Sequence, residues 1–394
     1  MKPIITCDVS KNKSHIRGYL NPETPLDKAF KIQHVKSGFK EIKSLAEKLK
    51  SLTGLYPAFV LEDTGVYSEC VKRYVERIGL DLYSISPLES AKQRKAKIRV
   101  TKTDPLDCDN IAKVYYSRNL RKSNNTYQNI RNLARSKESL TRQIITQKCN
   151  ISRYLDLIRP CIEDFFGDFD KKWLYVVIKQ YGHPDVLKRR TVDQIASLLM
   201  HQANKRKLNA YRIAHKLKDY ALEVVSGIQN NDETITQLVN SIKRLEQLTL
   251  EKDVINSKLN EKVKKYQIYE VIKHLPCVGE NLLLSLSSEL LNIDNYKSAK
   301  QLVAYAGLDP SILQSGKENG EHYSITKKGN GLLRSKLYLL VKLMLSNNKD
   351  NVFTRFYLKK KNSGLPSKAA VIATCRKLLT VIYGMNKNKT FILQ

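Results

Sequence analysis

Patterns typical of β-strands are confined to the first third of this 394-residue chain. Three strand-like segments come first, and two helical segments then alternate with two more strands. This order is typical of an α/β domain with a mixed sheet, which we expect over residues 1–125. The expected strands are 2–9, 14–20, 29–35, 57–62 and 80–85, and the expected helices are 39–52 and 66–78.

From about Tyr127 onward the strand patterns stop and helical spacing replaces them. Two long helices are predicted over 128–158 and 234–263, with a mostly helical segment between them. The apolar spacing suits a coiled-coil seam, although the heptads slip near Leu250, which argues against a strict supercoil. We therefore expect a helical, coiled-coil arm over 126–268 that contributes to dimerisation and nucleic-acid contact. A C-terminal α-helical domain is expected over 269–394, with helices at 271–291, 299–305, 330–345 and 367–383.

The charge of the chain indicates a polyanionic partner. Lysine and arginine number 69 against 38 acidic residues, a formal net charge of +31, and the excess is spread along the whole length. Nucleic acid is the natural partner for such a surface, through phosphate contacts and counterion release. Charge alone does not separate an enzyme from a binding protein.

Other compositional features narrow the class of protein. The apolar runs are far shorter than a membrane span, and the N-terminus leads straight into a strand without a signal-peptide pattern. The seven cysteines are scattered and form no C-x-x-C pair, which argues against a disulfide framework and a thiolate zinc site. We therefore expect a cytoplasmic protein with no membrane partner.

Four carboxylates occupy positions typical of a nuclease-type metal site. Asp8 lies near the end of the first strand, Glu62 ends the fourth, and Asp104 and Asp107 open a helix. Strand ends at one edge of an α/β sheet form a ligand-binding crevice, and residues three apart share a helix face. Carboxylate oxygens suit Mg²⁺, and two such ions can hold both reacting oxygens of a phosphodiester.

Each of these acids also has a purely structural interpretation. Asp104 precedes Pro105 as a helix N-cap would, and Asp107 stands where a capping-box acid is found. Glu62 and Asp8 could be turn or strand-end residues. The order and placement of all four together favour the metal site over these separate explanations.

The same residues resemble a known family. A hydrophobic strand followed by Asp, two residues and Lys occurs in Ile4–Lys11, Glu-x-Thr-Gly-x-Tyr in Glu62–Tyr67, and Lys-Thr-Asp-x-x-Asp in Lys102–Asp107. These motifs are similar to those of the DEDD transposases of the insertion-sequence one-ten family, relatives of the Piv site-specific invertase. The resemblance implies an RNase H-like (RuvC-like) first domain, with nucleic-acid contacts at Lys11 and Lys102. It also implies a site for Mg²⁺, with Mn²⁺ as the alternative, formed by Asp8, Glu62, Asp104 and Asp107.

The C-terminal third resembles the same family. Ala-Gly-Leu-x-Pro occurs in 306–310, Ser-Gly in Ser315-Gly316, and a Lys-x-Gly-Asn-x-x-Leu-Arg-like segment in 327–334. The resemblance implies that Ser315 is the nucleophile that attacks a DNA phosphate, and that the metal site assists it. The nucleic-acid contacts implied by the match are Gly316, Lys327, Lys328, Asn330 and Arg334.

Residues 275–284 resemble a helix-hairpin-helix, in which Gly279 begins a phosphate-binding helix. Cys277 stands where the family has its first glycine. Other departures are Cys7, Asp63, Cys108 and Thr326, and the arm over 148–230 has no residue-by-residue match.

Asp109 is an additional acid next to the metal-site motif. It is an alternative to Asp107 as a metal ligand.

The resemblance also implies partners. Members of this family move their own bacterial element, guided by a structured noncoding (bridge) RNA that pairs with donor and target DNA. The expected assembly is a homodimer that forms a tetramer, nucleoid-associated during the reaction, with a serine–DNA covalent intermediate. The RNA suits the heavy positive charge.

Three rival functions remain open. A structure-selective RuvC-like nuclease would use the same carboxylates with water as the nucleophile, and gives no role to Ser315. A non-catalytic nucleic-acid-binding protein would need neither metal nor serine. An actin-like kinase would carry glycine-rich phosphate loops, which this sequence lacks.

Overall fold

The computed structural model describes residues 1–63, 65–85, 90, 104–118, 120, 122, 127–168, 170–310, 324–347 and 350–391. Contacts divide the chain into two compact units, Met1–Thr126 and Tyr127–Gln394. Among the helices of the described ranges, none is long and apolar enough to cross a membrane.

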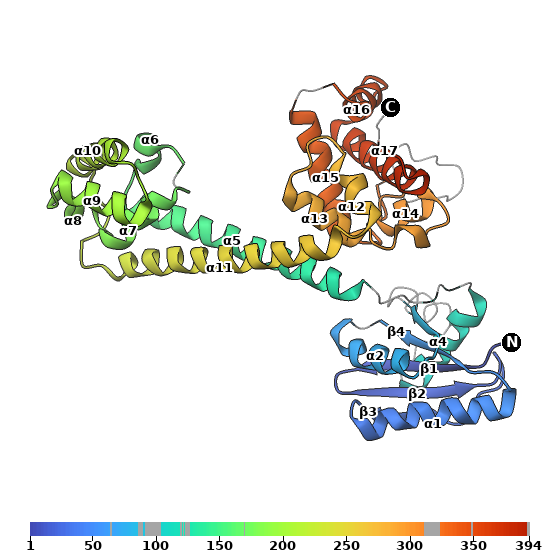
Figure 1. The fold of residues 1–394 in the computed structure, drawn as a ribbon. Helices are drawn as coiled ribbons and strands as arrows, with labels where there is room; N and C mark the ends of the chain where they lie inside the picture. The colour runs from blue at the N-terminus through green and yellow to red at the C-terminus, as the bar shows by residue number, and fades with distance from the viewer. Residues whose placement is uncertain are drawn as a thin grey trace. The chain divides into compact units, whose positions relative to one another are not determined.

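The first unit is built on a mixed five-stranded sheet in the order β3-β2-β1-β4-β5 (Figure 1). The central strand β1 pairs antiparallel with β2 and parallel with β4, and β4 pairs parallel with β5. This arrangement confirms the predicted α/β unit with a mixed sheet. The strands are β1 (Ile4–Ser10), β2 (Lys13–Tyr19), β3 (Phe30–Gln33), β4 (Ala58–Glu62) and β5 (Leu82–Ile85).

Helices cover both faces of this sheet, because successive side chains of β1 and β4 point to opposite sides and are buried on each. Cys7 and Leu61 belong to the core under α1 and α2, whereas Ile4 and Val60 pack with Ile111 of α4. The unit therefore has three layers, with the sheet in the middle. Among the described helices, α4 alone covers the second face. The helices are α1 (Lys36–Thr53), η1 (Gly65–Ser68), α2 (Glu69–Arg77) and α4 (Asp104–Ser117).

Two long helices of the second unit form an antiparallel pair, α5 (Gln128–Ile158) and α11 (Glu233–Val263). The start of α5 shares a core with the end of α11, and its end shares a second core with the start of α11. Both helices confirm the sequence prediction within a residue. The face of α5 assigned to a coiled-coil seam packs against α11 of the same chain.

A helical module lies between α5 and α11 in the sequence. It has its own apolar core, which includes Leu174, Leu199 and Leu217 and continues into the α5–α11 pair. The buried guanidinium of Arg159 donates to the carbonyls of Tyr181 and Gly182, which connects the end of α5 to the module. Its helices are α6 (Ile162–Phe166), α7 (Lys172–Gln180), α8 (Pro184–Lys188), α9 (Val192–Ala203) and α10 (Lys207–Glu223).

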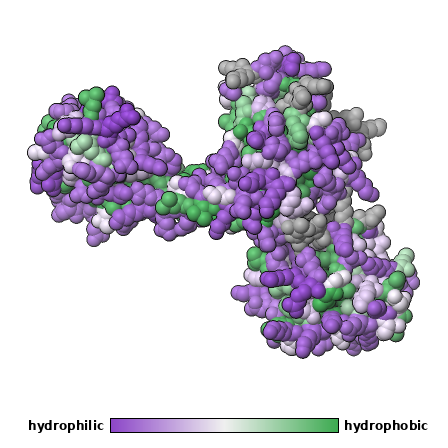
Figure 2. Space-filling model, in the orientation of Figure 1, coloured by the Kyte–Doolittle hydropathy of each residue, from purple (hydrophilic) through white to green (hydrophobic). Residues whose placement is uncertain are grey.

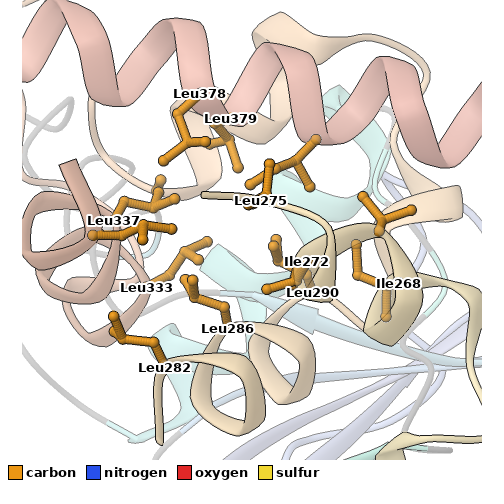
Figure 3. Close-up of a cluster of buried hydrophobic side chains, with 14 of the residues drawn as sticks. Ile268, Ile272, Leu275, Leu282, Leu286, Leu290, Leu333, Leu337, Leu378 and Leu379 are labelled. Carbon is orange, nitrogen blue, oxygen red and sulfur yellow. The ribbon is translucent and has the colours of Figure 1, made fainter. Parts of the chain in front are cut away.

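The last helices pack around a leucine-rich core. Figure 3 shows side chains of α12, α13, α15 and α17 meeting there, among them Ile272, Leu286, Leu337 and Leu378. The expected helices are present, and α16 is an element that the sequence analysis did not predict. The helices are α12 (Gln267–Lys273), α13 (Glu280–Glu289), η2 (Ile293–Asn295), α14 (Ala299–Tyr305), α15 (Gly331–Ser346), α16 (Val352–Asn362) and α17 (Ser367–Asn388).

Candidate active site

Asp8 and Glu62 lie at the ends of adjacent parallel strands. The β1–β4 register pairs Ile4 with Ala58 and Cys7 with Leu61, so one further step sets Asp8 beside Glu62. Because side chains alternate along a strand, both carboxylates belong to the face that carries Ile4, on which α4 packs. Glu62 is buried, with 8% of its surface exposed, and Asp8 is partly exposed.

The N-terminal turns of α4 bring Asp107 to this face. Asp107 is 6% exposed, and the backbone of Asp104 begins the helix. The side chain of Asp104 lies outside the described residues. Next to Asp107, the Cys108 thiol donates to the carbonyl of His15 at 3.3 Å, and burial raises the pKa of Cys108 to about 12. Burial is the largest cause of this shift, so the thiol is protonated at neutral pH.

Asp109 has a structural role. Its Oδ1 accepts from Arg17 Nη1 at 2.7 Å and from the Tyr19 hydroxyl. Burial, followed by the contact with Asp109, raises the pKa of the Tyr19 hydroxyl. These bonds tie α4 to β2.

Asp63 is also structural, although it directly follows Glu62. Its Oδ1 accepts from Ser68 Oγ and Lys72 Nζ, both at 3.0 Å, and from the Gly65 amide at 3.3 Å. Gly65 has φ +67°, a left-handed conformation that favours glycine. Asp63 therefore holds the turn that ends β4 behind Glu62.

One further residue of this site was missed by the sequence analysis. Asn110 is 3% exposed, and its Oδ1 has no hydrogen-bond partner among the described atoms. It follows Asp107 by three residues and so shares its helix face, which is the signal that could have found it. Asn110 thus has a buried amide oxygen about one helical turn from Asp107, and hard divalent cations take such oxygens as ligands.

The donor set fits Mg²⁺ chemically, because every group is an oxygen. Within the described ranges, no group of three or more His, Cys, Asp or Glu side chains has the spacing of a metal site. The side chain of Asp104, the fourth acid of the predicted set, lies outside those ranges.

Lys11, a predicted nucleic-acid contact, lies at the tip of the β1–β2 hairpin, three residues after Asp8. Its side chain is exposed. Lys102 lies outside the described residues.

Ser315 and Gly316 fall in 311–323, outside the described residues, but the structure describes both ends of this segment. Pro310 and Ile325 form an antiparallel bridge. Thr326 Oγ1 donates to Asp309 Oδ1 at 2.7 Å, and the Thr326 amide donates to the Asp309 carbonyl at 2.9 Å. The segment that carries Ser315 therefore starts and finishes at one point of the helical core.

Close backbone contacts fix that point. A Cβ on Gly329 would lie 2.4 Å from the Tyr305 carbonyl oxygen and 2.6 Å from the Gly307 nitrogen, so only glycine fits. Gly307 itself has φ +65°. The Ala-Gly-Leu and Lys-x-Gly motifs are thus the two halves of one tight junction.

Two of the predicted nucleic-acid contacts hold this junction together. Arg334 Nη1 donates to the Ala306 carbonyl at 2.9 Å. Asn330 caps α15 by accepting from the Leu333 amide at 3.0 Å, and its Nδ2 donates to the buried Glu289 at 2.5 Å. Lys327 and Lys328, in contrast, are exposed.

The hairpin between α12 and α13 has the backbone expected of its motif. Cys277 adopts φ +61°, the left-handed conformation for which the family uses glycine. Gly279 is the exposed N-cap of α13, with open space around its Cα. An exposed helix start of this kind is where a phosphate can approach backbone amides.

Comparisons with known proteins match both ends of the chain. Residues 5–160 match a transposase family typified by the DEDD residues and by IS110, and residues 269–358 match the transposase IS116/IS110/IS902 family. The pilin gene-inverting protein of Moraxella bovis is 27% identical over 229 residues, 55% of this chain and 66% of that protein. A 44.8 kDa protein of insertion element IS116 from Streptomyces clavuligerus is 24% identical over 246 residues, 61% of this chain and 59% of the relative.

The matched part of the chain thus spans slightly less than two thirds of each of these relatives. The two family matches agree with each other although they cover different ends of the sequence. Both ends of this chain therefore match transposases of the IS110 and IS116/IS110/IS902 type.

Proposed function

We propose that the chain is an RNA-guided DNA transposase that cuts and rejoins DNA through a serine–DNA covalent intermediate. The observation that carries the proposal is the placement of Asp8 and Glu62 side by side on the face where α4 brings Asp107. The family matches and the names of the relatives support strand cleavage and rejoining as the reaction class.

In this proposal the first unit is an RNase H-like metal domain, which its mixed sheet and carboxylate placement support. Asp8, Glu62, Asp104 and Asp107 would hold Mg²⁺, which supplies Lewis-acid stabilisation of charge on the phosphate oxygens. Asn110 would add an oxygen to the same face. Asp109 is assigned to the Arg17 contact and is left out of the site.

Ser315 is proposed as the nucleophile. Its Oγ forms a bond to phosphorus, its proton leaves to a base, and the sugar oxygen departs and is protonated. The phosphodiester energy is kept in the serine–phosphate bond, so a second DNA hydroxyl can reverse the step without ATP. The junction of Gly307 and Gly329 would hold the ends of the 311–323 segment while this occurs.

The nucleic-acid partners rest on charge and exposure. Lys11, Lys327 and Lys328 are exposed cations next to the proposed catalytic groups in sequence, and the net charge of +31 favours phosphate backbones. We propose donor DNA, target DNA and a structured noncoding RNA of the element as partners.

A homodimer is part of the same proposal. Figure 2 shows hydrophobic residues at the surface of the paired α5 and α11, where Ile145, Leu250 and Val254 are more than half exposed.

The experiment is an adduct assay with the protein, its flanking noncoding RNA, Mg²⁺ and element-end DNA, denatured in SDS. We expect a protein–DNA adduct for wild type, and none for Ser315→Ala or Asp8→Ala. Matched controls are Ser311→Ala, a second serine of the same segment, and Asp27→Ala, an exposed acid paired with Lys48. Cleavage without an adduct, retained by Ser315→Ala, would instead establish the water-dependent nuclease.

A further inference from the structure

A pocket in the helical module combines aromatic and basic side chains. It has a volume of about 880 Å³ and lies between α6, α7 and α10. Phe165, Phe166 and Trp173 line it together with Lys205, Arg212 and Lys216. The module belongs to the stretch between 160 and 269, which neither family match covers.

The aromatic part of the pocket is firmly packed. Phe166 meets Trp173 edge to face, with ring centroids 5.6 Å apart, and Phe165 meets Tyr220 in the same way at 5.0 Å. The Tyr220 hydroxyl donates to the Pro160 carbonyl at 3.0 Å, which fixes the ring below them. Phe166 is 9% exposed, whereas Phe165 and Trp173 are only partly buried and so present ring surface to the pocket.

The basic part surrounds this aromatic floor. Lys216 Nζ lies 5.5 Å from the centroid of the Phe166 ring, and Arg212, one turn earlier on α10, is exposed. Lys205 lies two residues before the first residue of the same helix. The described lining residues include no Asp or Glu, so the charge of the pocket is positive.

We propose that this pocket binds single-stranded nucleic acid. An unstacked base lies against Trp173 and Phe165, and the adjoining phosphates lie on Lys205 and Arg212. Aromatic surfaces recognise bases only when these are free of a duplex, and neighbouring cations hold the backbone. A free phosphate would not stack on the aromatic side chains, and an apolar ligand would not pair with the cations.

The chain contains a built-in reporter of this pocket, because Trp173 is its single tryptophan. The test titrates full-length Ser315→Ala protein with oligouridylate, oligothymidylate, and a blunt duplex, each about 12 nucleotides long. Tryptophan emission is followed. Both single strands are expected to quench Trp173, and the duplex is not. The stronger of the two single strands tells whether RNA or DNA is the natural occupant.

Arg212→Ala and Arg189→Ala form the matched pair of variants, since both arginines are exposed on the same module and only Arg212 lines the pocket. Removing Arg212 is expected to weaken the quenching affinity about three- to tenfold and to reduce the salt slope by about 1, with no change for Arg189→Ala. Absence of quenching by both single strands, or equal effects of the two variants, would overturn the proposal. The assay needs no strand cleavage, so its outcome is separate from that of the proposed transposase chemistry.

Discussion

The acidic residues of the first unit and the residues around Ser315 are positioned in different ways. Asp8 and Glu62 come from strands far apart in the sequence, and a backbone ladder sets them side by side. The two ends of the 311–323 segment are held together by close backbone contacts between Gly307 and Gly329, which are near each other in the sequence. The position of Asp8 and Glu62 therefore depends on backbone pairing between strands, which changes little when a side chain is substituted. The position of the 311–323 segment depends instead on a few backbone atoms of Gly307 and Gly329.

The largest expected effect separates two neighbouring acids of α4. Asp107→Asn should remove a metal ligand, whose loss costs several kcal/mol of transition-state stabilisation. This corresponds to a decrease in cleavage rate of roughly 10²- to 10³-fold. Asp109→Asn should retain cleavage within about tenfold and lower stability instead, because it removes the negative charge that pairs with Arg17. The measurement is the single-turnover cleavage rate, with urea unfolding in parallel.

The reverse ranking would show that Asp109 is the ligand and that its bond to Arg17 is broken in the active enzyme. Equal losses of cleavage rate for the two variants would mean that neither carboxylate is a metal ligand and that both only position α4.

The next largest effect is expected in the second region. Gly329→Ala should lower the free energy of unfolding by about 3 kcal/mol, since its Cβ would overlap backbone atoms of Tyr305 and Gly307. Gly384→Ala is the matched control, in open space within α17, and should stabilise by about 0.5–1 kcal/mol. Urea unfolding of both variants checks this, and a neutral Gly329→Ala would refute the tight junction.

Asn330 provides a finer test of the same junction. Asn330→Ala should cost about 2–3 kcal/mol, because it removes the cap of α15 and a hydrogen bond to the buried Glu289. Asn351→Ala removes the cap of α16 and should cost about 1 kcal/mol. If thermal or urea unfolding gives the same loss for both, the Glu289 bond contributes nothing.

The smallest effect concerns Lys137, which is 2% exposed and donates to the Asn281 carbonyl and Ser285 Oγ of α13. Burial, with the nearby Lys336, lowers the pKa of Lys137 to about 8 from 10.5. The unfolded chain therefore binds more protons between these values, so stability should rise with pH from 8 to 10.5. The gain is at most about 1.4 kcal/mol per pH unit across this interval.

Below pH 8 the cost of the buried charge is fully present, and above 10.5 it is gone. The Lys137→Met variant should lack this pH-dependent component. Urea unfolding of both proteins across the interval checks it, and parallel pH profiles would contradict it.

Elements with a long, regular apolar period were predicted correctly from the sequence. The two long helices and the central strands β1 and β4 belong to this group, because burial of a whole face leaves a clear pattern. The helical module was expected only as a mostly helical segment, since α6 and α8 are five residues each and too short to show a period. The pairing of α5 with α11 could not be read from spacing, which does not identify a helix's partner.

The sequence motifs predicted the site residues, and their roles stay predictions. Motifs identified Asp8 and Glu62, and the structure brings these to one sheet edge. The nucleic-acid contacts of Asn330 and Arg334 stay predictions, and the structure adds that both side chains bond within the protein. Hydrogen-bond partners distant in sequence leave no local pattern, and the aromatic pocket was missed because its lining comes from several separate helices.

The most direct test of the central claim is to identify the atom that carries the DNA. The SDS-resistant adduct is digested with nuclease and protease, and mass spectrometry locates the nucleotide remnant on a peptide. We predict that the remnant is on Ser315, within the peptide that joins Pro310 to Ile325. A remnant on another side chain, or cleaved DNA that leaves no remnant on the protein, would contradict the serine mechanism.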